Sequence, residues 1–597
     1  MSLRENVRYL HLWLKRKTDL KKYSHPENGI NVYDMPLGVT KIDEDVYCFL
    51  VSAPDEKNCT LSLFDKTGKC VLKTDMDAHA NGIFSCLTYG DFYSYAYRGD
   101  SGEIRDPYAK SILNRECFGK RTGKNVEFKK PLEHSHKEEI LPEMSFGEEI
   151  FYKLHVRGFT RDESACVKHP GTFLGVTEKI RHMKKLGATS VVLMPVYDFD
   201  ECSGENNINF WGYGACDTYY MAPKASYAFD KENPEKEFEF LVSELHKNNI
   251  KVFLEFLFDE TAGYSFIQDT LRYWVSAYGI DGFKLDSGNV PVKEILSDLK
   301  LFNTKFIISN YNVTDAENYK IRVFSFNRDF ETDMRRLIKG DEGMIPALFE
   351  YMKKRDIRSG IKYITDNNGF TLYDLYSYDI KHNEENKEYS DSGEDFNYSW
   401  NCGAEGETKN VRINALRLKM KKNLLLTLFL SGGAPLIYAG DETGNSQKGN
   451  NNSWCLDGET GWVNWNKPES NEIFKFIKEL ISLKRENKIF SESKNLSETD
   501  FKGAGLPQIS FHGMTPWKLD LKPYVRTCGI YFCADDMSKI YVIFNMHWEN
   551  HTFKLPLKSG ETFKIILSTD KGVVLKGDEI DVTGRTVVVL KNGGNDE

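Results

Sequence analysis

The chain has 597 residues, of which 40% are hydrophobic and 28% are charged, and its formal net charge is −9. This composition supports large buried cores and argues against a disordered chain. The acidic balance argues against a nucleic-acid partner, because phosphate binding needs a concentrated basic surface. Aromatic residues reach 13%, which suits stacking on sugar rings, although ordinary cores use such residues too.

The 12 cysteines are scattered singly, without a C-x-x-C pair. This spacing predicts neither a zinc site nor a disulfide framework, and we expect no metal and no cofactor. Residues 1–22 lack the apolar core of a signal peptide, and no apolar stretch has the length needed to cross a bilayer. We therefore expect a cytoplasmic protein with no membrane partner. The oligomeric state is left open.

Residues 1–145 are predicted to form a short basic arm followed by a β-sandwich. The arm, at residues 1–22, has a helical pattern. Short alternating apolar segments follow at 46–51 and 60–64, and such segments between turns are typical of a β-sandwich. A polar stretch at 133–139 is interpreted as a linker.

Apolar strand-like runs alternate with helical patterns across residues 146–495. The runs include 190–194, 252–254, 306–308 and 435–438. Repeated strand–helix units of this length predict a parallel (β/α)₈ barrel, the TIM barrel.

Beyond the barrel region the sequence returns to short strands, with runs at 540–544 and 586–590. These predict a third domain at residues 496–597, a small antiparallel β-sandwich. The fold class expected for the whole chain is a central barrel flanked by two β-domains.

Asp286 closes the apolar run at residues 279–286. Upstream, Tyr273, Trp274 and Tyr278 have the spacing of a helix that packs on this strand. A carboxylate at the C-terminal end of a barrel strand is typical of a catalytic residue, because the loops there form the active-site face. The alternative is that Asp286 is an inherited residue without a present role.

Several longer motifs resemble, in the same order, those of the pullulanase, isoamylase and glycogen-debranching branch of the α-amylase superfamily. Residues 152–160 resemble its first barrel strand, and residues 209–213 a segment that lines its glucan cleft. Residues 399–403, 439–442 and 544–549 match the isoamylase members. The resemblance covers nearly the whole chain. It implies a glycan-binding-type sandwich, a glycoside hydrolase barrel and an α-glucan ligand from starch or glycogen.

Retaining glycosidases use two carboxyl groups about 5–5.5 Å apart, one as nucleophile and one as acid and base. In this family a third carboxylate binds sugar hydroxyls. The resemblance assigns the nucleophile to Asp286, with Lys284 where the family has an arginine, which would hold a carboxylate more rigidly. It places Asn310 at the position of the acid/base glutamate and Asn368 at that of the third carboxylate.

Other residues of the same motifs also differ from the family pattern. Glu255, Asp259 and Glu260 stand where the first motif has Asp, Asn and His, and Asn367 stands where the fourth has His. The resemblance predicts that these residues, together with Asp366, bind substrate.

The substitutions predict an α-glucan-binding protein with impaired catalysis, a pseudoenzyme of the glycosidase type. An amide cannot release a proton near neutral pH, so general-acid assistance worth roughly 10²–10⁴-fold would be lost. The alternative is an active or slow α-1,6-glucosidase that uses Asp286 as nucleophile, with Glu255 or Glu260 as a substituted acid and Asp366 as the third carboxylate. A third possibility, a regulatory or scaffolding partner of other glycogen enzymes, is neither supported nor excluded.

Three aromatic residues are predicted to contact the glucan. Trp211 and Tyr213 belong to the segment that resembles a cleft wall, and Trp400 to the 399–403 motif. Packing within their own loops is the alternative explanation for each ring.

Overall fold

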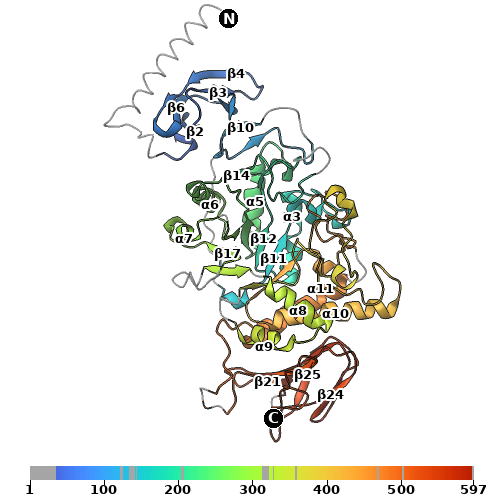
Figure 1. The fold of residues 1–597 in the computed structure, drawn as a ribbon. Coiled ribbons are helices and arrows are strands. Elements are labelled where there is room, and N and C mark those ends of the chain that lie inside the picture. Colours follow the sequence, from blue (N-terminus) through green and yellow to red (C-terminus); the bar gives the residue numbers. More distant parts are fainter. Residues whose placement is uncertain are drawn as a thin grey trace, which may run out of the picture. The chain divides into compact units, whose positions relative to one another are not determined.

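The computed structural model describes residues 35–120, 126–132, 141–142, 144–202, 208–288, 290–311, 322–326, 328–355, 360–466, 470–500, 503 and 505–593 (Figure 1). The predicted arm at residues 1–22 and the predicted linker at 133–139 lie outside these described residues. The chain forms two compact units. The N-terminal unit comprises Met1–His136, Val196–Glu205 and Ala215–Glu239, and the barrel unit comprises Lys137–Pro195, Asn206–Gly214 and Phe240–Glu597. The sequence-based division into three domains at residues 145 and 495 stays a prediction.

Two antiparallel sheets build the N-terminal unit. In spatial order, the first contains β1 (Gly38–Asp43), β2 (Val46–Ser52), β6 (Ile83–Tyr89) and β5 (Asp77–Ala78). The second contains β4 (Cys70–Asp75), β3 (Cys59–Phe64), β7 (Ser94–Gly99), β10 (Glu127–Lys129) and β9 (Ile112–Leu113), with β8 (Glu103–Ile104) paired to β7. Phe49, Leu61 and Tyr95, from both sheets, share one buried cluster. The predicted sandwich is confirmed. The same unit holds the antiparallel pair β13 (Tyr197–Asp198) and β14 (Tyr219–Pro223).

A closed barrel of parallel strands forms the centre of the barrel unit and confirms the predicted fold class (Figure 1). In order around the barrel, the strands are β11 (Phe151–Leu154), β12 (Ser190–Leu193), β15 (Lys251–Glu255), β16 (Gly282–Asp286), β17 (Lys305–Ser309), β18 (Val323–Phe326), β19 (Ile361–Lys362) and β20 (Ala434–Tyr438). Phe151, Val192, Phe253, Ile307 and Leu436 come from five of these strands and belong to one buried cluster. The barrel interior is therefore a packed core, as in other TIM barrels.

Helices follow most barrel strands. They are α2 (Val156–Thr160), α3 (Phe173–Glu178), α4 (Ile180–Leu186), α5 (Pro234–Lys247), α6 (Tyr264–Tyr278), α7 (Val292–Leu296), α8 (Asp329–Lys339), α9 (Ile345–Lys353), α10 (Val411–Leu430) and α11 (Ser470–Glu486). Helix α8 packs on α9 and α10, and α10 packs on α11. Within the described ranges, none of the helices combines the length and the hydrophobicity needed to span a bilayer.

Helix α6 shows why the segment before Asp286 folds as the sequence predicts. Its residues at helical spacing are buried, and Trp274 has no exposed surface. The Trp274 ring centroid lies 6.0 Å from that of Phe256, which lies 5.8 Å from that of Phe283 on β16. The helix ends at Gly279, whose φ of 70° is a left-handed conformation that glycine adopts without strain.

Two antiparallel sheets after the barrel confirm the predicted C-terminal β-domain. One contains, in spatial order, β21 (Ile509–His512), β22 (Thr527–Cys533), β23 (Lys539–Asn545), β28 (Thr586–Asn592) and β25 (Phe563–Ser568). The other contains β24 (His551–Lys554), β27 (Glu579–Val582) and β26 (Val574–Lys576). This domain packs on α10 through β28. Asn423 of α10 donates to the Arg585 carbonyl at 2.9 Å and accepts from Thr569 at 2.6 Å, and Lys419 pairs with Asp570 at 2.8 Å.

A buried carboxylate ties together the N-terminal ends of several barrel strands. Glu149 has no exposed surface; it forms ion pairs with Lys251 and, at 3.1 Å, with Lys305, and it accepts a hydrogen bond from Ser190 at 2.7 Å. Burial alone would raise the pKa of Glu149, but the two lysine charges outweigh it and lower that pKa. Glu149 is thus an ionised counter-charge for two lysines at the closed end of the barrel.

We predict that Glu149→Gln lowers the free energy of unfolding by about 3–5 kcal/mol, because two partly or fully buried lysines lose their counter-charge. The pKa of Glu149 is lower in the folded state than its ordinary value of 4.5. The contribution of Glu149 to the free energy of unfolding is therefore complete above pH 4.5 and is lost as the pH falls. The difference in the free energy of unfolding between Glu149→Gln and the wild type should therefore become smaller in acid. Urea titrations at neutral pH and in mild acid measure both effects.

Glu244→Gln is the matched control, since Glu244 pairs with Lys247 on the surface of α5 at 2.8 Å. A surface pair of this kind contributes about 0.5 kcal/mol or less. Equal losses in the free energy of unfolding for the two variants would contradict the role of Glu149 as a buried counter-charge.

Candidate active site

The C-terminal ends of three adjacent strands bring the predicted catalytic positions together. In the parallel register, Glu255 of β15 lies beside Lys284 of β16, and Asp286 of β16 lies beside Ser309 of β17. Asn310 follows directly. Residues 366–368 lie in the loop after β19, at the same end of the barrel. This end carries the active sites of TIM-barrel enzymes.

Asn310 and Asp286 are in direct contact. The Asn310 side-chain amide donates to the Asp286 carboxylate at 3.3 Å, and the Gly288 N–H donates to its other oxygen at 2.9 Å. Asn310 has a φ of 55°, a left-handed conformation that asparagine tolerates better than most residues. Ser287 stabilises this turn by donating to the Asn310 carbonyl at 3.0 Å. The residue beside Asp286 is therefore an amide, which donates to the carboxylate but cannot act as a general acid.

Lys153, on β11, is a central residue that the sequence analysis did not select. Its side chain is 0% exposed. Its ammonium lies 2.7 Å from Asp366 Oδ1 and 3.1 Å from Glu255 Oε2, and it donates to the side-chain oxygen of Asn367. These carboxylates outweigh the effect of burial and raise the pKa of Lys153. A lysine within an otherwise apolar strand is the sequence signal that marks this residue.

Glu255 lies between two lysines. One carboxylate oxygen pairs with Lys153 and the other with Lys284, whose ammonium also lies 4.6 Å from the Phe326 ring centroid. Burial favours the neutral acid, but the two lysine charges outweigh it and hold the pKa of Glu255 well below its ordinary value. Glu255 is therefore ionised near neutral pH and has no proton to donate to a leaving group.

The charges at this end of the barrel cancel in pairs. Lys153 and Lys284 balance Glu255 and Asp366, whereas the hydrogen bonds that Asp286 accepts within the described residues come from neutral donors. Asp286 thus accepts hydrogen bonds from a backbone N–H and a side-chain amide, and it lies beside the ion pairs formed by the two lysines.

The other predicted motif residues occupy different surroundings. Asp259 and Glu260 are exposed, and Asp259 accepts hydrogen bonds from the backbone and hydroxyl of Thr261 within its own turn. Asn367 is buried, as its contact with Lys153 requires, whereas Asn368 is exposed. The structure therefore joins Glu255, Lys284, Asp366 and Asn367 in one network and sets Asn368 at the surface beside it.

The predicted sugar-stacking rings have packing partners of their own. Trp211 is 3% exposed, and its ring lies 6.1 Å from that of Tyr213. Trp400 is half-buried, and the Arg585 guanidinium of the C-terminal domain lies 4.4 Å from its ring centroid. Packing accounts for these contacts, and stacking of sugars on the same rings stays a prediction.

Asp441 is a second residue that the sequence analysis did not assign to the site. It is buried after β20 and accepts hydrogen bonds from Thr365 and, at 2.9 Å, from the Leu372 N–H. Burial raises the pKa of Asp441 to about 7. These two bonds hold the start and the end of the loop that carries residues 366–368, so Asp441 positions that loop.

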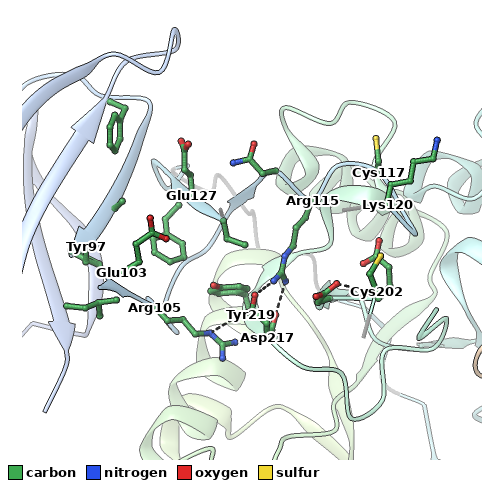
Figure 2. A pocket seen from close by; sticks show the side chains of 18 residues that line it. Tyr97, Glu103, Arg105, Arg115, Cys117, Lys120, Glu127, Cys202, Asp217 and Tyr219 are labelled. Carbon is green, nitrogen blue, oxygen red and sulfur yellow. Dashed lines mark hydrogen bonds and ion pairs between the residues drawn. The ribbon is translucent and has the colours of Figure 1, made fainter. Parts of the chain in front are cut away.

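A separate pocket of about 860 Å³ lies within the N-terminal unit (Figure 2). Two of its arginines pair with the same carboxylate: Arg115 and, at 3.5 Å, Arg105 each form an ion pair with Asp217. None of the predicted site residues lines this pocket. The candidate active site is therefore the C-terminal end of the barrel. It is identified by the motif residues that lie there and not by the size of a cavity.

Comparison with known proteins agrees with this architecture, although no family model matches the chain. Isoamylase 1, chloroplastic, of Arabidopsis thaliana is 27% identical over 675 residues, covering 90% of this chain and 84% of the relative. The catalytic module of the multi-modular glycogen-degrading pneumococcal virulence factor SpuA has a TM-score of 0.73 at 17% identity, covering 96% of this chain and 98% of that one. A pullulanase from Anoxybacillus sp. LM18-11, solved with maltotetraose, has a TM-score of 0.69 at 20% identity, covering 96% and 88%.

The fold, the ordered motifs and the isoamylase relative lead to one assignment. The isoamylase relative, together with a fold shared with a pullulanase-type catalytic module, supports the debranching branch of the α-amylase superfamily, that of isoamylases and pullulanases.

Proposed function

We propose that this chain is an α-glucan-binding member of the starch- and glycogen-debranching glycosidases in which hydrolysis is impaired. The observation that supports this most directly is the 3.3 Å contact between the Asn310 amide and the Asp286 carboxylate. In the family pattern that position holds the acid that protonates the leaving sugar. An amide there removes general-acid assistance while leaving a hydrogen-bonding group in place.

Binding can persist because the site keeps groups that suit hydroxyls. Asp286 and the exposed Asn310 and Asn368 offer acceptors and amide donors at the open end of the barrel. Glucose hydroxyls both donate and accept, so neutral amides serve them as well as charged groups do. The oxocarbenium-like transition state is different, because it needs negative charge to stabilise it.

Two carboxyl groups that could compensate for the substitutions are held in ion pairs. Glu255 is ionised between Lys153 and Lys284, and Asp366 is paired with Lys153 at 2.7 Å. A general acid must carry a proton near the working pH and reach the leaving oxygen. Glu255, held ionised by two lysine charges, does not meet the first condition, which favours impairment over compensation by this residue.

A second candidate function is a slow α-1,6-glucosidase. The retained Asp286, whose contacts come from a backbone N–H and an amide, favours it as a nucleophile that is still available. The location in the cytoplasm also stays a proposal, based on the scattered cysteines.

We predict that the wild-type chain binds branched maltooligosaccharides in isothermal titration. Asp286→Ala should weaken this binding by roughly ten- to a hundredfold, because a hydrogen bond to a charged group contributes about 1.5–3 kcal/mol. Asp581→Asn is the control, since Asp581 pairs with the exposed Lys576 on the C-terminal sheet. A wild-type chain that shows no binding at millimolar ligand would remove the glucan-binding proposal.

We predict that pullulan hydrolysis by the wild-type chain equals that of Asp286→Asn, measured as released reducing ends. Asn310→Glu should raise the rate, by up to roughly 10²–10⁴-fold if the acid position is fully restored. The neighbouring Asp286 carboxylate would also raise the pKa of the new glutamate, which suits an acid.

Asn310→Gln and the double variant Asn310→Glu/Asp286→Asn are the matched controls, and neither should gain activity. If the wild-type chain already hydrolyses pullulan and Asp286→Asn abolishes this, the slow glucosidase is correct and the impairment proposal fails.

A further inference from the structure

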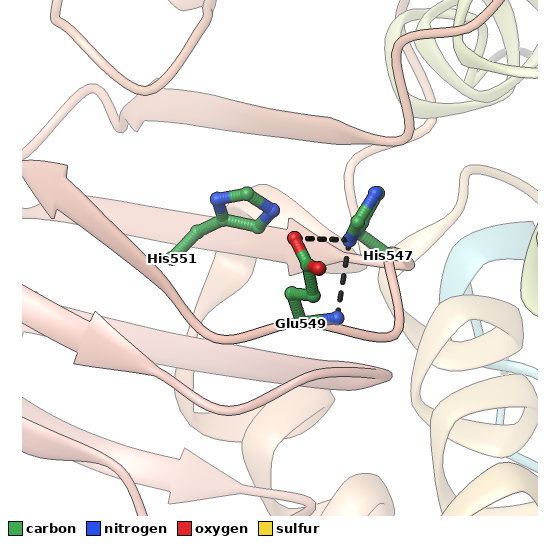
Figure 3. Close-up of side chains that lie close together, drawn as sticks. All are labelled: His547, Glu549 and His551. Carbon is green, nitrogen blue, oxygen red and sulfur yellow. Dashed lines mark hydrogen bonds and ion pairs between the residues drawn. The ribbon is translucent and has the colours of Figure 1, made fainter.

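The C-terminal domain carries two histidines and a glutamate on a single turn. His547 and Glu549 lie between β23 and β24, and His551 is the first residue of β24 (Figure 3). One possible ligand atom from each of the three side chains lies within 4.8 Å of the other two. In the ranges that the structure describes, no other group of three histidine, cysteine, aspartate or glutamate side chains is as close.

The side chains face one another, as Figure 3 shows. His547 Nδ1 lies 3.9 Å from Glu549 Oε2, and the rings of His547 and His551 are 4.9 Å apart at an angle of 72°. Zinc bonds of about 2.0–2.2 Å place two ligands of one tetrahedral ion about 3.3 Å apart. The three groups thus need to approach by about 1.5 Å at most, judged from these bond lengths. Glu549 can supply this movement, because its side chain is 68% exposed.

The turn already orients His547. Its ring stacks on Trp548 at 4.0 Å, and its Nδ1 accepts a hydrogen bond from the Glu549 N–H at 3.1 Å. The lone pair of Nδ1 therefore points toward the glutamate, and a metal ion would replace this single hydrogen bond. The nearby Arg526 guanidinium, 5.5 Å from the Trp548 ring centroid, pairs with Glu342 at 3.1 Å, which reduces its repulsion of a cation.

We propose that His547, Glu549 and His551 form a surface site for a divalent transition-metal ion, with Zn²⁺ as the first choice and water completing the coordination. Two imidazoles and one carboxylate suit borderline metals such as zinc, whereas magnesium and calcium prefer sites made of oxygen ligands. The site lies in the C-terminal domain, outside the barrel end. The proposal departs from the expectation, drawn from the scattered cysteines, that the chain has no metal site.

A metal here would brace a connection between the C-terminal domain and the barrel. The His547 carbonyl accepts a hydrogen bond from the Arg585 N–H at 2.8 Å, and the Arg585 guanidinium covers Trp400. Fixing the turn at His547 therefore limits the movement of the residue that packs on Trp400.

The test uses the full chain, without a polyhistidine tag and stripped of metal with a chelator. Isothermal titration with Zn²⁺ measures stoichiometry and affinity, and titration with Co²⁺ reports coordination through its visible absorption. We expect one ion per chain with micromolar affinity or better. Glu549→Gln and His551→Ala should each weaken binding by about tenfold or more, since losing a ligand costs at least as much as losing the second-shell partner of one.

His169→Ala is the matched control, because His169 and Glu178 form a histidine–carboxylate pair at 2.9 Å on the barrel unit. It should bind Zn²⁺ as the wild type does. Thermal unfolding without metal checks that each variant is folded. When Zn²⁺ is added, the unfolding midpoint should rise for the wild type and for His169→Ala, but not for Glu549→Gln or His551→Ala. If the wild type binds no ion in the micromolar range, or if Glu549→Gln and His551→Ala keep its affinity, the proposal is wrong.

Discussion

A lysine with no exposed surface keeps its charge only when carboxylates surround it, and Lys153 imposes this constraint on the open end of the barrel. Asp366 and Glu255 provide the counter-charges, and Glu255 in turn pairs with Lys284. Four ionisable groups are thereby committed to one another. The groups that stay available to hydrogen-bond with a ligand are Asp286 and the amides around it.

This network explains why several charged side chains are buried at the open end of the barrel. Removing one partner of a buried ion pair leaves the other without compensation, which commonly costs about 3–5 kcal/mol. The ion pair between Lys153 and Glu255 therefore stabilises the fold, whatever the barrel does with a glucan. The same argument applies to Glu149 at the opposite ends of the strands, where one carboxylate serves two lysines.

Patterns that depend on neighbouring residues could be read from the sequence. The run that ends at Asp286 and the helical spacing of Trp274 are local, and they gave the strand, the helix and the end of the barrel where Asp286 lies. The contact between Asp286 and Asn310 also follows from strand order, since consecutive parallel strands end side by side.

Contacts between distant segments could not be read in this way. Lys153, Glu255 and Asp366 meet only because a closed barrel joins their strands. Trp400 reads as a possible sugar platform until Arg585, far along the chain, is found over its ring. His547, Glu549 and His551 follow no familiar metal-binding spacing, and a turn, not a helix, brings them together.

The contacts between α10 and the C-terminal domain limit how far the chain can be truncated. Asn423 and Lys419 of that helix direct polar groups into the C-terminal domain, where Arg585, Thr569 and Asp570 receive them. Truncation after the last barrel helix would leave these groups facing water and uncover the apolar surface between them. The C-terminal domain thus covers one side of α10, and a shortened version of the chain has to include it.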